Sequence, residues 1–465
     1  MKNFVLFFTC MFASIFVYSQ CTFERIYERN LAEYSHSIKQ TMDGGYIIAG
    51  TTSIIGSSPT GVYLLKTNSC GDTLWSRIIS KHYQDAGVDV LQLIDSGYII
   101  LAYATINTNN WDVFLIRTNQ DGDTLWTKTI GDTINEFGNS FARTYDGGYI
   151  IAGQVSSVQG HSDIILFRTD SIGNLLWTKN YGNGSDDNIA YSVAQTFDSS
   201  FVITGRKYIL YQPTQVFILK TNNHGDTIWA KCLSDTTKSS CGYSIMQTAD
   251  SGLIVIGDCV NDIYLIKTNV DGDSLWSKKY GGSAYETGCA VSQTDDGGYI
   301  LAGNTLSFGA GAMDYYIIKI DSAGNELWSE TYGGSSDDEC HSVMQIQDGG
   351  FVVSGHKQIS NCNWDIYVVK TDKSGHVETS GNWEINENLE LNIIPNPASS
   401  NISLQFSGRF GLTKKLEIFD CYGQLQLTKT GSFYDIDISS LTSGLYLIVL
   451  TNLDNERLTS KLIKE

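Results

Sequence analysis

One short motif recurs seven times along this chain and limits what it can fold into. An Asp-(Gly/Ser)-(Gly/Ser) turn followed by a short apolar run is found at Asp43, Asp95, Asp146, Asp198, Asp250, Asp296 and Asp348. Successive copies are 46 to 52 residues apart. A unit of that length with strand signals does not bury its own apolar faces, whereas stacked copies do. The spacing therefore predicts a closed array of all-β repeats.

The repeat at 243–280 shows how each unit is built. Four strands are expected at 243–248, 253–256, 262–268 and 275–280, joined by hairpins with turns at Asp250 and Asp271. Four antiparallel strands linked in this way have the form of a propeller blade. The chain is therefore predicted to contain an all-β, seven-bladed β-propeller at 21–372.

The seventh repeat lacks its outer strand. Six repeats carry a Trp in the fourth strand, at Trp75, Trp126, Trp177, Trp229, Trp276 and Trp328, but no such strand follows residue 371. Residues 23–27 match the pattern of 276–280, so we expect an N-terminal strand to close the ring and remove two open sheet edges. The alternative is that residues 377–383 form the missing strand.

Features shared by all repeats are best interpreted as structural, because every blade has the same packing problem. The Gly of the turn tolerates positive φ, and the Trp is expected between neighbouring blades. A basic residue ends every third strand, and we expect it to make a repeated surface or inter-blade polar contact: Lys66, Arg117, Arg168, Lys220, Lys267, Lys319 and Lys370.

The net charge argues against some classes of partner, and the N-terminus indicates export. With 31 basic and 50 acidic residues the net charge is −19, which makes nucleic acid and anionic lipid poor partners. Lys2 and the apolar stretch 4–17 have the pattern of a signal peptide at 1–20. No transmembrane segment is expected, because this stretch is too short to cross a bilayer. A lipid anchor on Cys21 is the alternative.

Export permits disulfides among the nine cysteines outside the leader. Cys232 and Cys241 flank a short polar loop and are candidates for closing it, while Cys289 and Cys340 occupy nearly equivalent points of successive repeats. Buried free thiols are the other reading. No Cys/His group has the spacing of a structural zinc site.

A set of acidic residues lies ten positions before each turn motif. The seven positions hold Glu33, Asp85, Glu136, Asn188, Ser240, Glu286 and Asp338. A second set opens the third strands: Asp112, Asp163, Asp262, Asp314 and Asp365. Because strands alternate direction, both sets are expected on one face, around the mouth of the channel. Such a face favours a cation or a basic ligand; solvated loop acids and turn capping are the alternative.

Loops of variable length are expected on the same face, where a rigid scaffold commonly carries recognition. Aromatic residues in or beside them, Tyr103, Trp111, Tyr211 and Trp364, have side chains that stack on sugars or peptides or pack inward. The ligand-binding face is accordingly assigned to Glu33, Asp85, Glu136, Glu286, Asp338, Trp111 and Trp364.

Metal and cofactor signals are weak. No cofactor is expected, although turns such as Asn119–Asp123 and Asn269–Asp273 faintly resemble calcium loops without the downstream bidentate Glu. His36 and His341 occupy the same place in the first and last blades, which a ring makes neighbours. They are either a metal pair or channel-lining side chains that meet by chance.

Residues 390–465 form a different module after a polar linker at 373–389. Some six or seven short strands predict a small β-sandwich. Its motifs are Pro395-Asn396-Pro397, an Asp-x-x-Gly turn ending at Gly423, Leu441-x-x-Gly444-x-Tyr446, and a basic tail with Lys461. This segment closely resembles the C-terminal sorting domain of type IX secretion cargo in Bacteroidota. The resemblance implies recognition by that machinery, an Ig-like sandwich, and secretion or display on the outer cell surface.

Function follows from the site, because propellers serve many functions. No nucleophile elbow, zinc-protease motif or phosphate-binding loop is present. The leading hypothesis is a non-enzymatic module that binds a protein or polysaccharide. The alternative is a secreted polysaccharide-active hydrolase or lyase with its site at the channel mouth, and a third reading is a structural surface component.

Overall fold

The computed structural model divides the chain into two compact units, Met1–Val377 and Glu378–Glu465. It describes residues 21–377 and 391–465, apart from 30, 54–59, 108–109, 157–159, 183, 185, 209–210, 234–236, 361–362, 407–412, 421–423, 431–435 and 453–456. The expected signal peptide and most of the expected linker lie outside the described residues. Among the described residues there is no helix able to span a membrane.

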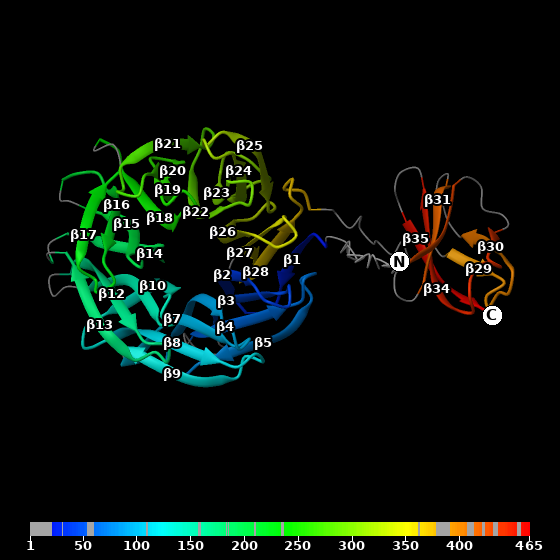
Figure 1. Cartoon of the computed structure of the whole chain (residues 1–465), viewed down its shortest axis with the longest axis horizontal. Helices are drawn as coiled ribbons and strands as arrows, with labels where there is room; N and C mark the ends of the chain where they lie inside the picture. The colour runs from blue at the N-terminus through cyan, green and yellow to red at the C-terminus, as the bar shows by residue number, and fades with distance from the viewer. Residues whose placement is uncertain are drawn as a thin grey trace, which may run out of the picture. The chain divides into compact units, whose positions relative to one another are not determined.

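The described part of the first unit forms a ring of seven four-stranded antiparallel sheets (Figure 1). We number them as blades 1 to 7. Blade 1 contains β2 (Glu33–Gln40), β3 (Tyr46–Ser53), β4 (Thr60–Thr67) and β5 (Thr73–Ile79); blade 2, β6 (Asp85–Gln92), β7 (Tyr98–Asn107), β8 (Asn110–Thr118) and β9 (Thr124–Ile130); blade 3, β10 (Glu136–Arg143), β11 (Tyr149–Ser156), β12 (Ser162–Thr169) and β13 (Leu175–Tyr181).

Blade 4 contains β14 (Asn188–Gln195), β15 (Phe201–Lys207), β16 (Gln215–Thr221) and β17 (Thr227–Cys232); blade 5, β18 (Ser240–Gln247), β19 (Leu253–Cys259), β20 (Asp262–Thr268) and β21 (Ser274–Tyr280); blade 6, β22 (Glu286–Gln293), β23 (Tyr299–Thr305), β24 (Asp314–Ile320) and β25 (Glu326–Tyr332). Blade 7 contains β26 (Asp338–Gln345), β27 (Phe351–Ser360), β28 (Asn363–Thr371) and β1 (Phe23–Tyr27). The predicted all-β propeller architecture is confirmed.

The N-terminal strand completes blade 7. β1 pairs with β28, and Phe23 lies opposite Lys370 just as Trp276 lies opposite Lys267 in blade 5. The sheet order β1-β28-β27-β26 therefore joins the two ends of the ring. Residues 378–383 of the alternative outer strand lie outside the described residues, and β1 occupies the edge of β28.

Phe23 replaces the Trp found in the other outer strands. A Cβ on Gly71 of blade 1 would lie 2.7 Å from the Phe23 ring, and a Cβ on Gly122 of blade 2 would lie 2.8 Å from Trp75. Each glycine has a φ near +80°, so the turn brings bare backbone onto the preceding blade's aromatic ring. The outer-strand Trp or Phe thus packs at the seam between blades, as expected from the repeat.

Most of the apolar core lies between successive sheets. One cluster combines Ile47 and Val62 of blade 1 with Tyr98 and Ile100 of blade 2, and Trp75 packs against it. Equivalent clusters join the following blades, and one joins Phe23 and Ile366 of blade 7 to Ile38 of blade 1. Each repeat therefore buries its faces against its neighbours.

The two most regular features of the repeat contact each other. The basic residue that ends each third strand forms an ion pair with the Asp of its own blade's turn: Lys66 with Asp43, Arg117 with Asp95, Arg168 with Asp146, Lys220 with Asp198, Lys267 with Asp250, Lys319 with Asp296 and Lys370 with Asp348. The basic side chains are buried. The expected surface or inter-blade contact is therefore a contact within each blade.

The turns that resemble calcium loops are closed by their own Asn or Asp side chain. Asn119 Oδ1 accepts hydrogen bonds from the backbone N–H groups of Asp121 and Asp123, at 2.9 and 2.8 Å. Its Nδ2 donates to Asp123 Oδ2, and Gly122 adopts a φ of 81°. A hairpin turn with a left-handed glycine accounts for this geometry.

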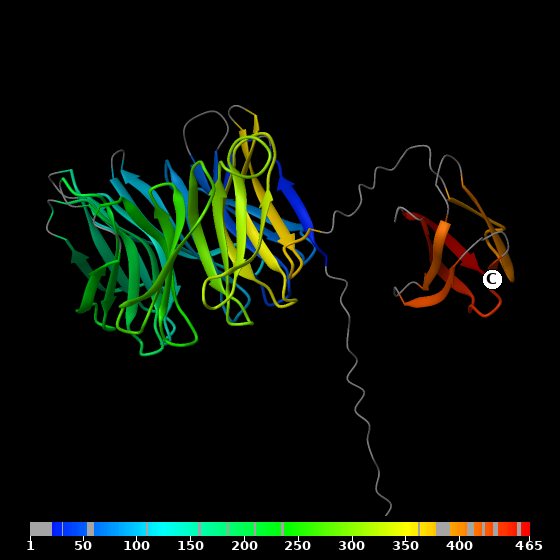
Figure 2. The same cartoon turned by 90° about the horizontal axis from the view of Figure 1, so that it is seen from above.

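The two ends of the ring differ (Figure 2). One end carries the repeated turns between first and second strands and between third and fourth strands. The other end, which we call the loop face, carries the second-to-third-strand loops and the connections between blades. The loop face therefore contains most of what distinguishes one repeat from the next.

The described cysteines are free, so the expected Cys232–Cys241 link is not formed. Cys289 and Cys340 meet across the seam between blades 6 and 7, where burial and the neighbouring Cys289 thiol raise the pKa of Cys340. Cys21 contacts Cys70, and burial together with that thiol raises the pKa of Cys21 to about 11. The reading of buried free thiols fits Cys241, Cys259 and Cys340, whereas Cys232 is an exposed free thiol.

The second unit has two sheets around one core, which fits the predicted small sandwich. One sheet contains β29 (Leu391–Ile394), β30 (Asn401–Phe406) and β33 (Ile436–Asp437). The other contains β32 (Leu425–Thr430), β31 (Thr413–Asp420), β34 (Gly444–Asn452) and β35 (Arg457–Lys464). Ile402, Leu416, Ile448 and Leu462 are among the fully buried residues of the shared core.

Candidate functional site

The five predicted carboxylates all lie at the loop-face end of an innermost strand, but they are buried. Relative exposure is 0% for Glu33, Asp85, Glu286 and Asp338, and 5% for Glu136. The expectation of an acidic surface made by these side chains is therefore corrected. Burial is possible because each carboxylate has partners in the loops or strands that surround it.

These carboxylates anchor the connections between blades. Asp85 Oδ2 accepts a hydrogen bond from the N–H of Lys81 at 2.6 Å, Glu136 Oε2 accepts from Asp132 at 2.9 Å, and Glu286 Oε2 accepts from Gly282 at 2.8 Å. Asp338 forms an ion pair with Lys357 at 2.9 Å. Hydrogen bonds to an ionised group are among the stronger ones in proteins, so the acids hold the loop face in place.

The second acidic set meets the first across the seams. Glu33 hydrogen-bonds to Asp365, and burial raises the pKa of both groups. Burial, with nearby Asp132 and Asp112 contributing, raises the pKa of Glu136 to about 7. Glu286 behaves differently, because hydrogen bonds from Ser307, Gly282 and Thr305 outweigh burial and lower its pKa. Buried carboxylates of one ring thus differ in the charge they carry at neutral pH.

Trp111 and Trp364 are half-buried at the starts of β8 and β28. Trp111 lies with its ring centroid 5.3 Å from Tyr103 and 6.0 Å from Phe137 of the next blade. Trp364 lies 5.0 Å from His356 and 6.3 Å from Tyr34. The two predicted Trp residues therefore belong to aromatic clusters that cross seams on the loop face.

A β-bulge occurs at the same place in every innermost strand. The pairing register shifts around one residue in each, three positions after the buried acid or its equivalent. We call these residues the channel ring: His36, Val88, Asn139, Tyr191, Tyr243, Cys289 and His341. All are half-buried. Bulges re-aim side chains and are common beside functional sites.

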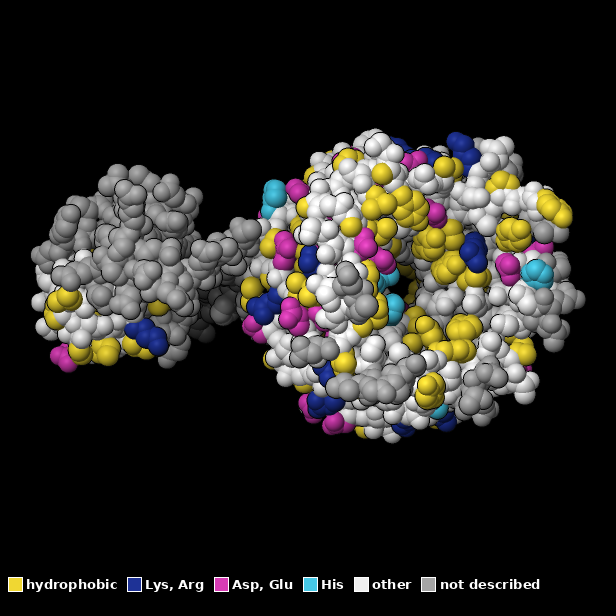
Figure 3. Space-filling view, turned by 180° about the vertical axis from the view of Figure 1, so that it is seen from behind, with side chains coloured by type: hydrophobic (Ala, Val, Ile, Leu, Met, Phe, Trp, Pro, Cys, Tyr) yellow, Lys and Arg dark blue, Asp and Glu magenta, His cyan; other side chains and the backbone are white. Residues whose placement is uncertain are grey.

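The channel ring is chemically irregular within a regular scaffold. The innermost strands contact their neighbours all the way round, so these side chains surround the central opening. Figure 3 shows apolar and histidine side chains at its mouth. The ring centroids of Tyr191 and Tyr243 lie 5.2 Å apart, and Asn139 Nδ2 donates a hydrogen bond to the carbonyl of Ala190 at 2.8 Å. Different side chains at equivalent positions of the blades are typical of a binding site rather than of the shared scaffold.

A second irregular ring consists of one residue from each second strand, the one directly after a Gly or Ala. We call it the seam ring: Thr51, Tyr103, Gln154, Arg206, Asp258, Asn304 and His356. Each member pairs with the residue two positions before the channel-ring residue of its own blade. Contacts also reach the next blade, since Asn304 Oδ1 accepts a hydrogen bond from Cys340 N at 2.7 Å. Five of them carry a buried polar atom without a hydrogen-bond partner among the described residues: Thr51, Gln154, Arg206, Asp258 and His356.

Buried polar atoms are normally hydrogen-bonded, and exceptions concentrate where water or a ligand binds. The sequence analysis did not predict either ring, although it singled out four members for other reasons: His36, Cys289, His341 and Tyr103. Aligning the seven repeats places these positions in one column each, and the variation within the column was the available signal. The repeat motif is defined by the residues that its copies share, so it does not reveal the positions at which the copies differ.

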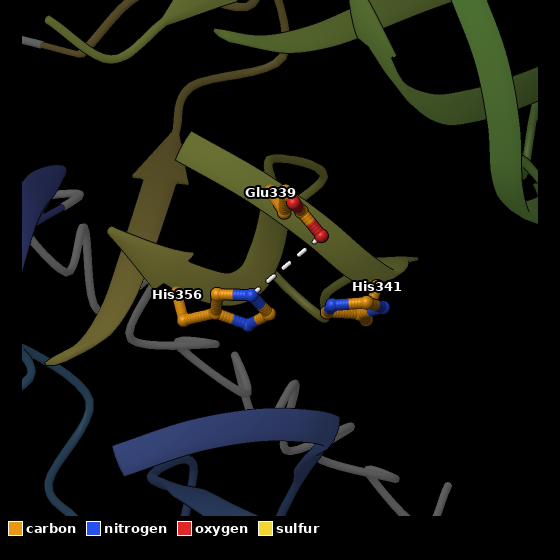
Figure 4. Close-up of side chains that lie close together, drawn as sticks. All are labelled: Glu339, His341 and His356. Atoms are coloured by element: carbon orange, nitrogen blue, oxygen red, sulfur yellow. Dashed lines mark ion pairs between the residues drawn. The ribbon is translucent and has the colours of Figure 1, made fainter. Parts of the chain in front are cut away.

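The prediction that His36 and His341 are neighbours is confirmed, since their ring centroids lie 5.5 Å apart. Burial lowers the pKa of His36 to about 4 and that of His341 well below its usual value. His341 also forms a compact group with His356 and Glu339, which the sequence analysis did not select (Figure 4). The cluster lies at the seam between blades 7 and 1, where the ring closes.

A hollow of about 520 Å³ lies outside this region, at the rim between blades 5 and 6. Lys279, Tyr280, Tyr316 and Glu330 line it. We place the candidate site at the channel instead, because there the irregular side chains and the unpartnered polar atoms converge.

The motif residues of the second unit hold its last strand in place. Asn396 Nδ2 donates to the carbonyl of Lys461 at 2.7 Å, and Ile463 N donates to Asn396 Oδ1 at 2.8 Å. Tyr446 donates from its hydroxyl to the carbonyl of Thr442, and Leu441 is buried. Pro395 and Pro397 flank Asn396, Gly444 begins β34, and Lys461 is exposed. Gly423 lies outside the described residues.

The fold and these motifs define the class of the protein: a β-propeller followed by a secretion sorting domain. Residues 392–465 match the family model of the secretion system C-terminal sorting domain. The predicted resemblance of this segment to a secretion sorting domain is therefore confirmed, and such a domain implies secretion to the cell surface or the medium. Comparison with curated proteins gives no match.

Solved structures resemble the fold at low identity. PorZ, a surface component of the type IX secretion system of Porphyromonas gingivalis, is 10% identical over 91% of this chain and 69% of its own, with a TM-score of 0.36. An ulvan lyase is 9% identical over 74% of this chain and 96% of its own (TM-score 0.48). Puromycin hydrolase is 10% identical over 89% and 58% (TM-score 0.47). Such similarity carries no argument about ligand or activity.

Proposed function

We propose that this protein is an exported, non-enzymatic binding module that takes a protein or polysaccharide ligand on the loop face, at the mouth of the channel. One observation carries the proposal: the repeats place different side chains in the channel ring and the seam ring, on a scaffold that is otherwise regular. A rigid scaffold with variable loops at one end is the usual arrangement of recognition surfaces.

Aromatic side chains on the loop face support contact with a sugar or peptide. Tyr211, between β15 and β16, is 94% exposed and has a φ of 65°. A positive φ is costly for a bulky residue and persists where the surroundings impose it. Trp111 and Trp364 lie half-buried on the same face. Aromatic rings of this kind supply much of the free energy of binding at interfaces.

The buried acids have an indirect part in this proposal. Glu33, Asp85, Glu136, Glu286 and Asp338 hold the connections from which the loop face is built, and the ligand contacts the residues around them. The same type of buried anchor at five of the connections between blades then supports one irregular surface.

The test is a screen of the full chain without its leader on glycan and surface-protein arrays, followed by affinity measurement. Tyr211→Ala and Trp364→Ala are expected to weaken binding at least tenfold. Tyr145→Ala is the matched control, because Tyr145 is 63% exposed on the opposite end of the ring. Unchanged affinity in both loop-face variants, or an equal loss in the control, contradicts the assignment.

The enzymatic alternative has one supporting observation. A carboxyl with a pKa of about 7, as for Glu136, suits a general acid, and a hydrolase or lyase needs such a group. Against it, Glu136 is 5% exposed and its Oε2 is occupied by a backbone N–H. Release of shorter oligosaccharides from any bound polymer, lost in Glu136→Gln, would place the protein among the enzymes.

A further inference from the structure

We propose that Glu339, His341 and His356 form a binding site for one divalent transition-metal ion of the zinc class, at the seam between blades 7 and 1. One ligand atom from each residue lies within 4.8 Å of the other two. The site does not rest on the proposed function, because metal binding is measured without any other ligand.

The backbone brings the three residues together in two ways. Glu339 on β26 and His356 on β27 are direct cross-strand partners. His341 is two residues beyond Glu339 on the same strand, so the two side chains share a face of the sheet. Its imidazole stacks on that of His356 with ring centroids 4.9 Å apart. Strand register therefore places two imidazoles and a carboxylate side by side.

The donor atoms are available. His356 is 6% exposed, its Nε2 lies 3.7 Å from Glu339 Oε2, and its Nδ1 has no hydrogen-bond partner among the described residues. His341 Nε2 is likewise buried and unpartnered within the described part of the chain. Buried imidazole nitrogens without partners are uncommon, and a metal ion bound by His341 Nε2 gives that atom a partner.

The chemistry of the set selects the ion. Two imidazoles and one carboxylate suit zinc and its first-row neighbours, whereas calcium and magnesium prefer all-oxygen sets. With metal–ligand bonds of about 2.1 Å, donors in a tetrahedral site lie roughly 3.4 Å apart. Small side-chain rotations close the remaining gap, and the partly exposed Glu339 is free to make them.

Neighbouring side chains shape the site. Tyr34 and Trp364 pack edge-on against His356, each with centroids 5.0 Å away, and restrict that imidazole to one orientation. His36 of blade 1 approaches His341 from the opposite side of the seam. With three protein ligands, a zinc-class ion has a fourth coordination position left for water or another ligand.

The experiment uses the tag-free full chain without its leader, stripped with a chelator and dialysed. Titration with Zn²⁺ by calorimetry is expected to give one equivalent bound with a Kd of micromolar or tighter. Co²⁺ serves as a spectroscopic probe, because nitrogen-ligated Co²⁺ in a low-coordinate site absorbs visibly. His356→Gln and Glu339→Gln are each expected to weaken Zn²⁺ binding at least tenfold and to remove the Co²⁺ bands.

His224→Gln is the matched control, since His224 is exposed in a distant turn, and it is expected to bind as the unaltered protein does. Thermal melts establish that each variant is folded, and the partly exposed Glu339 offers a variant that spares the core. Failure to bind Zn²⁺ at 100 µM, or full binding by folded Glu339→Gln and His356→Gln proteins, overturns the proposal. Preference for Ca²⁺ over Zn²⁺ overturns it as well.

Discussion

At the scale of single residues, two carboxylates in equivalent positions differ in the charge they favour. Glu136 of blade 3 and Glu286 of blade 6 both begin an innermost strand. Burial beside Asp132 and Asp112 favours the neutral form of Glu136, whereas hydrogen bonds from the Ser307 loop favour the charged form of Glu286. The surroundings of a carboxylate, more than its place in the repeat, decide its pKa.

Glu136→Gln is expected to stabilise the protein at alkaline pH. The folded pKa of about 7 lies above the ordinary value of 4.5, so the stability from protonated Glu136 is complete below pH 4.5 and is lost as pH rises through 7. Gln stays neutral, which should raise the free energy of unfolding by roughly 1–3 kcal/mol at pH 8 relative to the unaltered protein. Denaturant titrations from pH 4.5 to 8.5 measure the difference.

Glu286→Gln is the opposing case. The lowered folded pKa means that stability from ionised Glu286 is present above the unfolded value and is lost as pH falls through the folded pKa. Its two oxygens accept from Gly282, Ser307 and Thr305. The amide nitrogen of Gln cannot accept, so a loss of about 1–3 kcal/mol is expected at pH 7. Equal effects of the two substitutions would contradict this account.

Asp296→Asn tests the repeated ion pair. Although partial burial opposes it, hydrogen bonds from Thr294 and Lys319 lower the pKa of Asp296 to about 2. The resulting stability is present above the ordinary pKa of 3.8 and is lost as pH falls toward 2. The variant leaves the buried Lys319 ammonium with a weaker partner and should cost about 1–3 kcal/mol at neutral pH.

Asp271→Asn, in an exposed turn at the same end of the ring, is the control for Asp296→Asn and should change the melting temperature little. Urea denaturation at pH 7 and at pH 3 distinguishes the two variants. A loss at Asp271 as large as at Asp296 would argue against a special role of the pair.

At the scale of elements, β1 decides whether the ring is closed. Its five residues complete blade 7 and cover the edge of β28. Phe23 packs against blade 1, and the Tyr27 hydroxyl donates to the carbonyl of Gly71 at 2.8 Å. The same bond joins Tyr280 to Gly324. The first strand therefore makes the contacts at this seam that an outer strand makes elsewhere.

Phe23→Ala is expected to destabilise the propeller by about 3–5 kcal/mol, because it removes a buried ring and leaves a cavity at the closing seam. Ile26→Ala in the same strand is the control, since Ile26 is 38% exposed. Chemical denaturation gives the stability, and limited proteolysis detects release of β1. Equal stability of the two variants would show that closure does not depend on the Phe23 contact.

Some features of the strands and turns are predictable from the sequence, and others are not. The blade pattern, the strand order within a blade and the replacement of Trp by Phe23 follow from the repeat and its turns. The burial of Glu33 or Asp338 did not, because a carboxylate at a strand end has the same sequence appearance whether it faces water or accepts backbone hydrogen bonds. The bulges were also not predicted, since no single residue type is common to all seven positions of that column.

At the scale of the whole molecule, export and binding belong to different units. The sorting domain at 392–465 directs the protein outward, while the irregular rings lie in the propeller. A sorting signal acts independently of its cargo's ligand, so each activity should be removable without the other.

Deletion of residues 391–465 is expected to abolish appearance of the propeller on the cell surface and in the medium. The truncated chain should accumulate inside the outer membrane, as measured by fractionation and antibody against the propeller. Trp364→Ala in the full-length chain is the control and should be exported normally. Export of the truncated chain at the normal level would show that the propeller carries its own signal.

The amino-acid sequence alone determined the repeat, the all-β class, the closing strand and the sorting domain. Each depends on local pattern: turn glycines, alternating apolar positions and motifs contiguous in the chain. Only the tertiary structure decided that five acids are buried anchors and that His341, His356 and Glu339 meet. Those outcomes depend on the register between paired strands and on what the neighbouring blade presents across the seam, and neither is encoded by residues adjacent in sequence.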